Sequence, residues 1–104
     1  MPQAARVTDE HRGACDHGDI CCPHNVVGTI TEGSPNVLVN GLQAARLSDP
    51  VIHDCPHCGT GYISGASGTV RANGLGIARL GDPVTYPGGG GEITTASGNV
   101  RAGD

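Results

Sequence analysis

The stretches Ile30–Val51 (ITEGSPNVLVNGLQAARLSDPV) and Ile63–Val84 (ISGASGTVRANGLGIARLGDPV) begin 33 residues apart and align without a gap. A third copy begins at Ile93 (ITTASGNVRAGD) and stops at the last residue of the sequence. The half that it lacks is found near the other terminus, where Gln3–Asp9 (QAARVTD) matches Gln43–Asp49 (QAARLSD). Self-similarity at a fixed period indicates a repeat architecture. We therefore expect three units that close across the two termini into a ring with pseudo-three-fold symmetry.

Each unit has the pattern of short β-strands joined by tight turns. In the first full copy a strand around Ile30 is followed by a turn of small residues, and a second strand places Val37 and Val39 on one face. An Asn-Gly pair, which favours a hairpin, begins at Asn40, and a third strand is expected over 45–47. The sequence thus predicts an all-β fold of about nine short strands, in one domain that spans residues 1–104.

Composition narrows the class of protein. The chain has 18 Gly and 7 Pro but no Trp or Phe, so its core must be built from small aliphatic side chains. Its net charge is −4 and its six basic residues are scattered arginines, which argues against a nucleic-acid partner. No apolar run approaches the ~20 residues of a membrane span, and we expect no signal peptide and no appended toxin domain.

Three connections between a repeated Asp and the following strand differ in length and content. They cover residues 10–29, 50–62 and 83–92, and the first two contain all five His and all five Cys. The third offers Tyr86 and the run Gly88–Gly91, which we interpret as a tight turn because no Lys-Ser/Thr follows it. Loops that leave a ring at equivalent points converge on its axis, so a metal ion could link them.

The mixture of His and Cys favours a structural zinc, which takes four N or S ligands in a closed tetrahedral site. Ten candidates compete for four positions, and registration against the repeat ranks them. His53 lies four residues after Asp49, and both His57 and His24 lie six before the next strand's Ile. The predicted order of preference is His57, His53, His24, His17, Cys58 and Cys55, followed by His11, Cys15, Cys21 and Cys22. For the adjacent pair Cys21-Cys22, a disulfide to Cys15 or Cys55 remains open beside metal binding.

The recurring Arg and Asp of each unit are three residues apart, in the pairs Arg6/Asp9, Arg46/Asp49 and Arg79/Asp82. We interpret them as structural, with each Arg bridging neighbouring turns or its own Asp. No nucleophile, base and orienting group stand in a recognisable context, and a closed zinc site cannot activate water. The sequence therefore does not favour an enzyme.

The repeated unit resembles the PAAR-repeat proteins, which are named after a Pro-Ala-Ala-Arg motif. The resemblance rests on Gln3–Arg6, Gln43–Arg46 and Gly76–Arg79, none of which begins with Pro, and it covers essentially the whole chain. It implies a small cone with a zinc ion near its apex, held in the family by three His and one Cys, the Cys usually in the third loop. The third loop of this chain has no Cys, so the sulfur ligand must come from another loop, or the site differs.

The resemblance also implies a function and a partner. PAAR-repeat proteins cap the trimeric β-helical spike (of the VgrG or phage spike type) in type VI secretion systems and contractile phage tails. One chain, monomeric when free, would bind each trimer, and it would meet the target membrane only transiently on injection. We expect it in the cytoplasm before firing, or on a phage baseplate. Iron in place of zinc, and a stand-alone zinc-binding or thiol redox-sensing module, remain alternatives.

Overall fold

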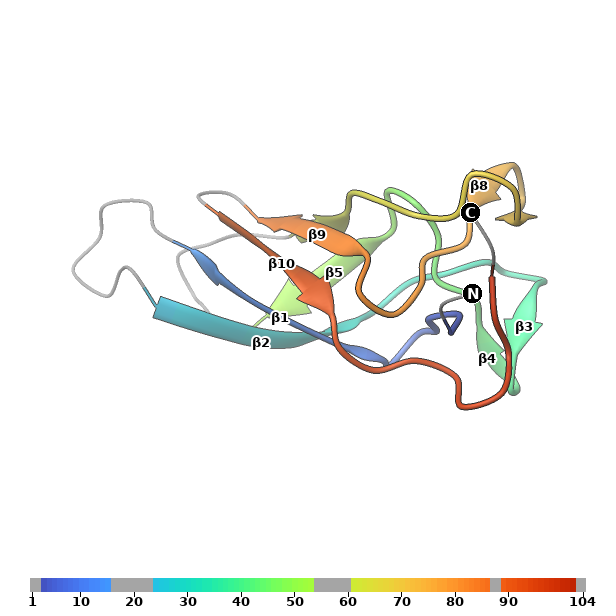
Figure 1. The fold of residues 1–104 in the computed structure, drawn as a ribbon, viewed down its shortest axis with the longest axis horizontal. Coiled ribbons are helices and arrows are strands. Elements are labelled where there is room, and N and C mark those ends of the chain that lie inside the picture. Colours follow the sequence, from blue (N-terminus) through green and yellow to red (C-terminus); the bar gives the residue numbers. More distant parts are fainter. Residues whose placement is uncertain (1–2, 16–23, 54–60, 87–88, 103–104) are drawn as a thin grey trace.

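A computed structural model describes residues 3–15, 24–53, 61–86 and 89–102, together an elongated body with extents of 40 × 23 × 22 Å (Figure 1). These residues form strands and turns, with no helix long and apolar enough to cross a membrane. Ten strands are present in the described residues: β1 (Glu10–Cys15), β2 (His24–Ile30), β3 (Leu38–Val39), β4 (Leu42–Gln43), β5 (Pro50–His53), β6 (Gly61–Ile63), β7 (Arg71–Ala72), β8 (Leu75–Gly76), β9 (Pro83–Tyr86) and β10 (Gly89–Ile93).

Six of the strands close into an antiparallel barrel in the order β1-β10-β9-β6-β5-β2. Within each repeat two strands pair across the variable connection: β1 with β2, β5 with β6, and β9 with β10. Between repeats β2 pairs with β5, β6 with β9, and β10 with β1. The last of these pairings joins the third repeat to the first, so the barrel closes without a free edge.

The pseudo-three-fold ring is confirmed at its centre by a cycle of backbone hydrogen bonds. Ala5 N–H donates to the carbonyl of Ala78 at 2.9 Å, Ala78 N–H to Ala45 at 2.9 Å, and Ala45 N–H to Ala5 at 3.0 Å. All three alanines are fully buried. Each repeat thus gives and receives the same bond, and the small side chain allows the three backbones to meet.

The ring closes across the termini, as the split repeat predicts. Gln3 forms an isolated bridge with Arg101, and Ala4 N–H donates to the Val100 carbonyl at 2.8 Å. In return Ser97 N–H donates to the Ala4 carbonyl at 2.8 Å. The third unit is therefore assembled from both ends of the chain.

The expected Asn-Gly hairpins are confirmed, but the expected third strand is wrong. Asn40 (φ 53°) and Gly41 (φ 81°) both have positive φ, as does the second pair, so that β3 pairs with β4 and β7 with β8. Beyond the hairpin, Ala44 and Arg46 form single bridges to two different repeats instead of continuing a ladder. The segment 44–46 therefore joins units together.

Two clusters of small aliphatic side chains form the core. The barrel interior contains a ring of isoleucines and valines, all at most 2% exposed: Ile30, Ile63, Ile93, Val26, Val51 and Val84. A second cluster lies among the hairpins at the opposite end and is built from Ala4, Val39, Ala44, Ala72, Ile77 and Ala102. Val39 is buried and Leu38 is exposed, so the predicted alternation along the second strand holds.

The glycine run of the third connection is a strand where we expected a tight turn. Residues 89–91 belong to β10, which pairs with β1 so that Gly91 stands opposite Gly13. A Cβ at Gly91 would lie 2.0 Å from the backbone oxygen of Arg12. Glycine is required because the two backbones approach closely, and a glycine run has no side-chain alternation from which a strand could be predicted. Gly88 lies outside the described residues.

Candidate metal centre

The barrel strands that flank the His/Cys-rich connections end at one pole of the molecule, opposite the hairpins β3–β4 and β7–β8 (Figure 1). The last residue of β1, Cys15, pairs with the first residue of β2, His24. Cys15 also pairs with Gly89 of β10, which in turn pairs with Tyr86 of β9. His53 ends β5 and pairs with Gly28 of β2. Antiparallel pairing thus directs all three connections toward the same pole, with His53 level with Gly28, four residues along β2 from His24.

The structure describes only part of the predicted ligand set. Cys15, His24 and His53 are placed as strand-end positions, and among the fully described residues no group of three His, Cys, Asp or Glu gathers as a metal site would require. Outside the described residues lie His17, Cys55, His57 and Cys58, together with Cys21 and Cys22. The choice of four ligands therefore stays a prediction.

His11, the lowest-ranked of the five histidines, lies inside the barrel. It is fully buried, with Nε2 at 2.6 Å from the Ile52 carbonyl oxygen and Nδ1 at 2.6 Å from the Tyr86 hydroxyl. A carbonyl oxygen only accepts, so Nε2 carries the hydrogen and donates it. In the neutral imidazole Nδ1 then accepts from the tyrosine O–H. Both ring nitrogens are hydrogen-bonded within the protein, which is the arrangement of a core histidine.

Tyr86 is the single large side chain of the third connection, and its role is one that the sequence did not suggest. It is 2% exposed, and burial raises its pKa to about 12. Its ring occupies space that a glycine leaves open, because a Cβ at Gly61 would lie 2.6 Å from the tyrosine Cδ1. The sequence does contain one signal for a buried partner of His11. His11 stands at the inward position that Val51 and Val84 occupy after the other repeated Asp residues, and a buried polar side chain requires a hydrogen-bonding partner.

The repeated Arg/Asp pairs form three equivalent clamps with the same geometry. In the second, Asp49 Oδ2 accepts from Arg46 N at 2.8 Å and from its Nε at 2.9 Å, while Oδ1 accepts from Nη2 at 3.0 Å. The distances are identical for Arg6 with Asp9 and for Arg79 with Asp82. The hydrogen bond to the carboxylate is the main cause that raises the pKa of Arg6 and of Arg46. Each Arg therefore binds its own Asp, one of the two arrangements expected from the sequence, and the structural role of these pairs stays a prediction.

The chain thus contains three copies of one motif, each with the same Arg/Asp clamp, arranged around a cyclic centre. A comparison with models of known repeat families tests whether this motif is a known one. The family model described as PAAR motif matches the chain twice, over residues 2–57 and 23–86. The chain belongs to the PAAR-motif family. A comparison with curated proteins gave no match.

Family membership associates this chain with the spike tips of contractile systems. PAAR-motif proteins are structural components at the spike tips of type VI secretion and related contractile systems. The fold agrees with this role, because the closed six-stranded barrel is compatible with a small PAAR cone.

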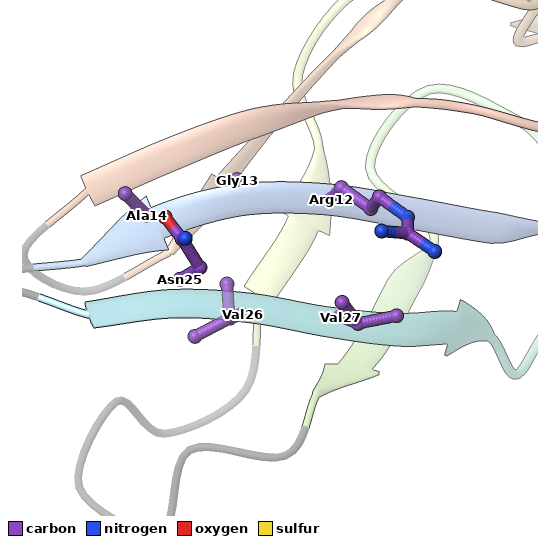
Figure 2. A pocket seen from close by; sticks show the side chains of 6 residues that line it. All are labelled: Arg12, Gly13, Ala14, Asn25, Val26 and Val27. Carbon is purple, nitrogen blue, oxygen red and sulfur yellow. The ribbon is translucent and has the colours of Figure 1, made fainter.

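An open hollow of about 420 Å³ lies beside the β1–β2 hairpin of the PAAR fold (Figure 2). Its lining consists of Arg12, Gly13, Ala14, Asn25, Val26 and Val27. Among the described lining residues none is a His, Cys, Asp or Glu, and Ala14 and Asn25 are the sequence neighbours of Cys15 and His24.

Proposed function

We propose that this chain is the piercing tip that caps the trimeric β-helical spike of a contractile injection system, and that a structural zinc makes its apex rigid. The observation that carries the proposal is the cyclic hydrogen bonding of Ala5, Ala45 and Ala78 in a member of the PAAR-motif family. One chain can satisfy the three identical ends of a trimer only if it presents three similar surfaces.

The pole with the hairpins is the surface that we assign to the spike. It carries the short strands β3 and β7, and Leu38 of β3 is 59% exposed (Figure 1). Short exposed strand edges can pair with the strand edges at the end of a β-helix, which would otherwise be left open. We assign a spike of the VgrG or phage type as the partner, with one chain per trimer.

The opposite pole is the apex, and its chemistry fits zinc. The sequences of the first two connections supply imidazole and thiolate groups, the donors that a structural zinc takes. The ion would be held by four residues from the set His57, His53, His24, His17, Cys58, Cys55 and Cys15. When bound, zinc ties the connections together, because such ions contribute roughly 10–16 kcal/mol of apparent binding energy to small domains.

Metal analysis and thermal unfolding test the zinc. We expect purified protein to hold zinc, and we expect its removal by a chelator to lower the melting temperature sharply and its return to restore it. Iron in place of zinc would change the identity of the ion but not its role. An unchanged melting temperature in a metal-free preparation would refute the structural metal.

Two matched substitutions test which pole binds the spike. Leu38→Asp places a charge among the hairpins, whereas Ile52→Asp places one on the side of the barrel, where Ile52 is 52% exposed. In a pull-down with a trimeric spike protein as bait, L38D should lose binding and I52D should retain it. Equal binding by both variants would rule out the assigned surface.

A further inference from the structure

We propose that Tyr86 and His11 act together as positioning residues for the metal centre, and that through them the third connection, residues 83–92, contributes to a site to which it offers no His or Cys ligand. This inference rests on the structural zinc proposed above. It concerns two side chains that are described in full: Tyr86 is not among the predicted ligands, and His11 is the lowest-ranked histidine of that set.

The two side chains link residues of all three connections in one hydrogen-bonded chain. The Tyr86 hydroxyl on β9 lies 2.6 Å from His11 Nδ1 on β1, and His11 Nε2 lies 2.6 Å from the Ile52 carbonyl on β5. The rings of His11 and Tyr86 are tilted by 44° with centroids 5.4 Å apart, so they also pack against each other. Both side chains are at most 2% exposed, which keeps water from replacing either bond.

The chain of bonds ends on the peptide that joins Ile52 to His53. His53 is the second-ranked ligand, and the Ile52 carbonyl carbon is bonded to its backbone nitrogen. Mutation of a group that orients a metal ligand through a hydrogen bond typically lowers metal affinity by about 10–100-fold. Fixing this peptide fixes the point from which a ligand on β5 must reach the ion.

The pseudo-symmetry shows what is special about these two positions. His11 stands two residues after Asp9, where the other connections have Val51 and Val84, and Tyr86 stands four residues after Asp82, where the second connection has His53. The third connection therefore has a hydrogen-bonding phenol at the position of a predicted ligand. If His11 only filled space, an aliphatic side chain would serve as well, as Val51 and Val84 do at the equivalent positions.

A double-mutant cycle on zinc affinity tests the proposal. Tyr86→Phe removes one hydroxyl and keeps the ring, and His11→Val installs the residue of the equivalent positions. Competition with a chromophoric chelator should show zinc binding weakened by about tenfold or more in each variant. Because both variants break one chain of bonds, the double variant should bind no more weakly than His11→Val alone.

The matched control is Val84→Ala, which removes packing on the same strand without touching a hydrogen bond. It should lower the melting temperature of the metal-free protein but leave the zinc dissociation constant unchanged. The visible spectrum of the Co²⁺-loaded protein should keep the ligand-field bands of wild type in Tyr86→Phe, since no ligand is removed.

Three results would overturn the inference. If Tyr86→Phe lowers stability and leaves zinc affinity intact, the pair is structural only, while the proposed zinc stands. If His11→Val alone abolishes binding and changes the Co²⁺ spectrum, His11 is itself a ligand. If wild-type protein binds neither zinc nor Co²⁺, the metal of the proposed function fails, and the positioning role fails with it.

Discussion

Removal of the clamp carboxylate, as in Asp49→Ala, should destabilise the protein strongly. Asp49 is 6% exposed and accepts three hydrogen bonds, two from the guanidinium of Arg46 and one from its backbone N–H. Loss of a buried partner of a charge costs roughly 3–5 kcal/mol. Because the Arg46 side chain remains 16% exposed and can recruit water, we place the cost at the lower end, about 3 kcal/mol. For a domain of this size that corresponds to a fall in melting temperature of about 15 °C.

The pseudo-symmetry predicts that the other two clamps contribute equally to stability. Asp9→Ala and Asp82→Ala remove the same three bonds at the same distances, so all three variants should lose similar stability. Glu32→Ala is the control, since Glu32 is exposed and acts on Arg46 only through a long-range charge. Its effect should stay within about 0.5 kcal/mol.

Urea unfolding followed by far-ultraviolet circular dichroism is the appropriate assay, because the chain has no Trp. Zinc must be held at one excess concentration throughout, since a ligand of the native state adds to its apparent stability. If all three Asp→Ala variants lose less than about 0.5 kcal/mol, the clamps are ordinary surface ion pairs and the reasoning is wrong. If one variant alone is destabilised, the repeats are alike in geometry but not in energy.

Three further predictions concern single positions. Thr8 has a φ of 81°, which strains a β-branched residue, so Thr8→Gly should raise the free energy of unfolding by about 1 kcal/mol in the same assay; a loss of stability would contradict the strain. Gly91→Ala places a Cβ 2.0 Å from a backbone oxygen and should cost about 3 kcal/mol or prevent folding, whereas Gly98→Ala meets nothing within 4 Å and should be neutral or slightly stabilising; equal effects would contradict the close approach of β1 and β10. Burial raises the pKa of Tyr86 to about 12 from an ordinary value of about 10, so the unfolded state loses that proton first and stability should fall by up to about 3 kcal/mol as the pH rises from 10 to 12, being fully retained below 10. Unfolding of Tyr86→Phe measured over the same pH range should lack this component, and its persistence would assign the fall to another group.

The ring and its turns could be predicted from sequence because their signals are local and repeated. The Asn-Gly pairs require positive φ, and the split third copy requires that Gln3 and Arg101 meet. The sequence predicts a third strand over 45–47, but Ala44 and Ala45 are both buried, and Ala44 and Arg46 form single bridges to different partners. A local sequence pattern does not determine which neighbouring segment a backbone group forms its hydrogen bond with.

The apex could be predicted only in outline. The sequence predicts loops over 10–29, 50–62 and 83–92, whereas the structure places most of the six barrel strands there. Residues 89–91 of β10 are glycines, which carry no side-chain alternation from which a strand could be predicted. The sequence offers ten His and Cys for four ligand positions, and selection among them depends on how three connections approach one another in space. For His11 the structure shows a core position with both ring nitrogens hydrogen-bonded. The pairing of His11 with Tyr86, 75 residues away, has no local signal.

The mass of the complex with a trimeric spike tests the central claim most directly. Native mass spectrometry of this chain mixed in excess with a trimeric spike protein of the VgrG or phage type should give one chain per three spike chains, with no higher occupancy. A pseudo-three-fold ring closed by Ala5, Ala45 and Ala78 predicts that ratio, because one chain covers all three ends of the trimer. Three chains per trimer, or no complex, would contradict the account.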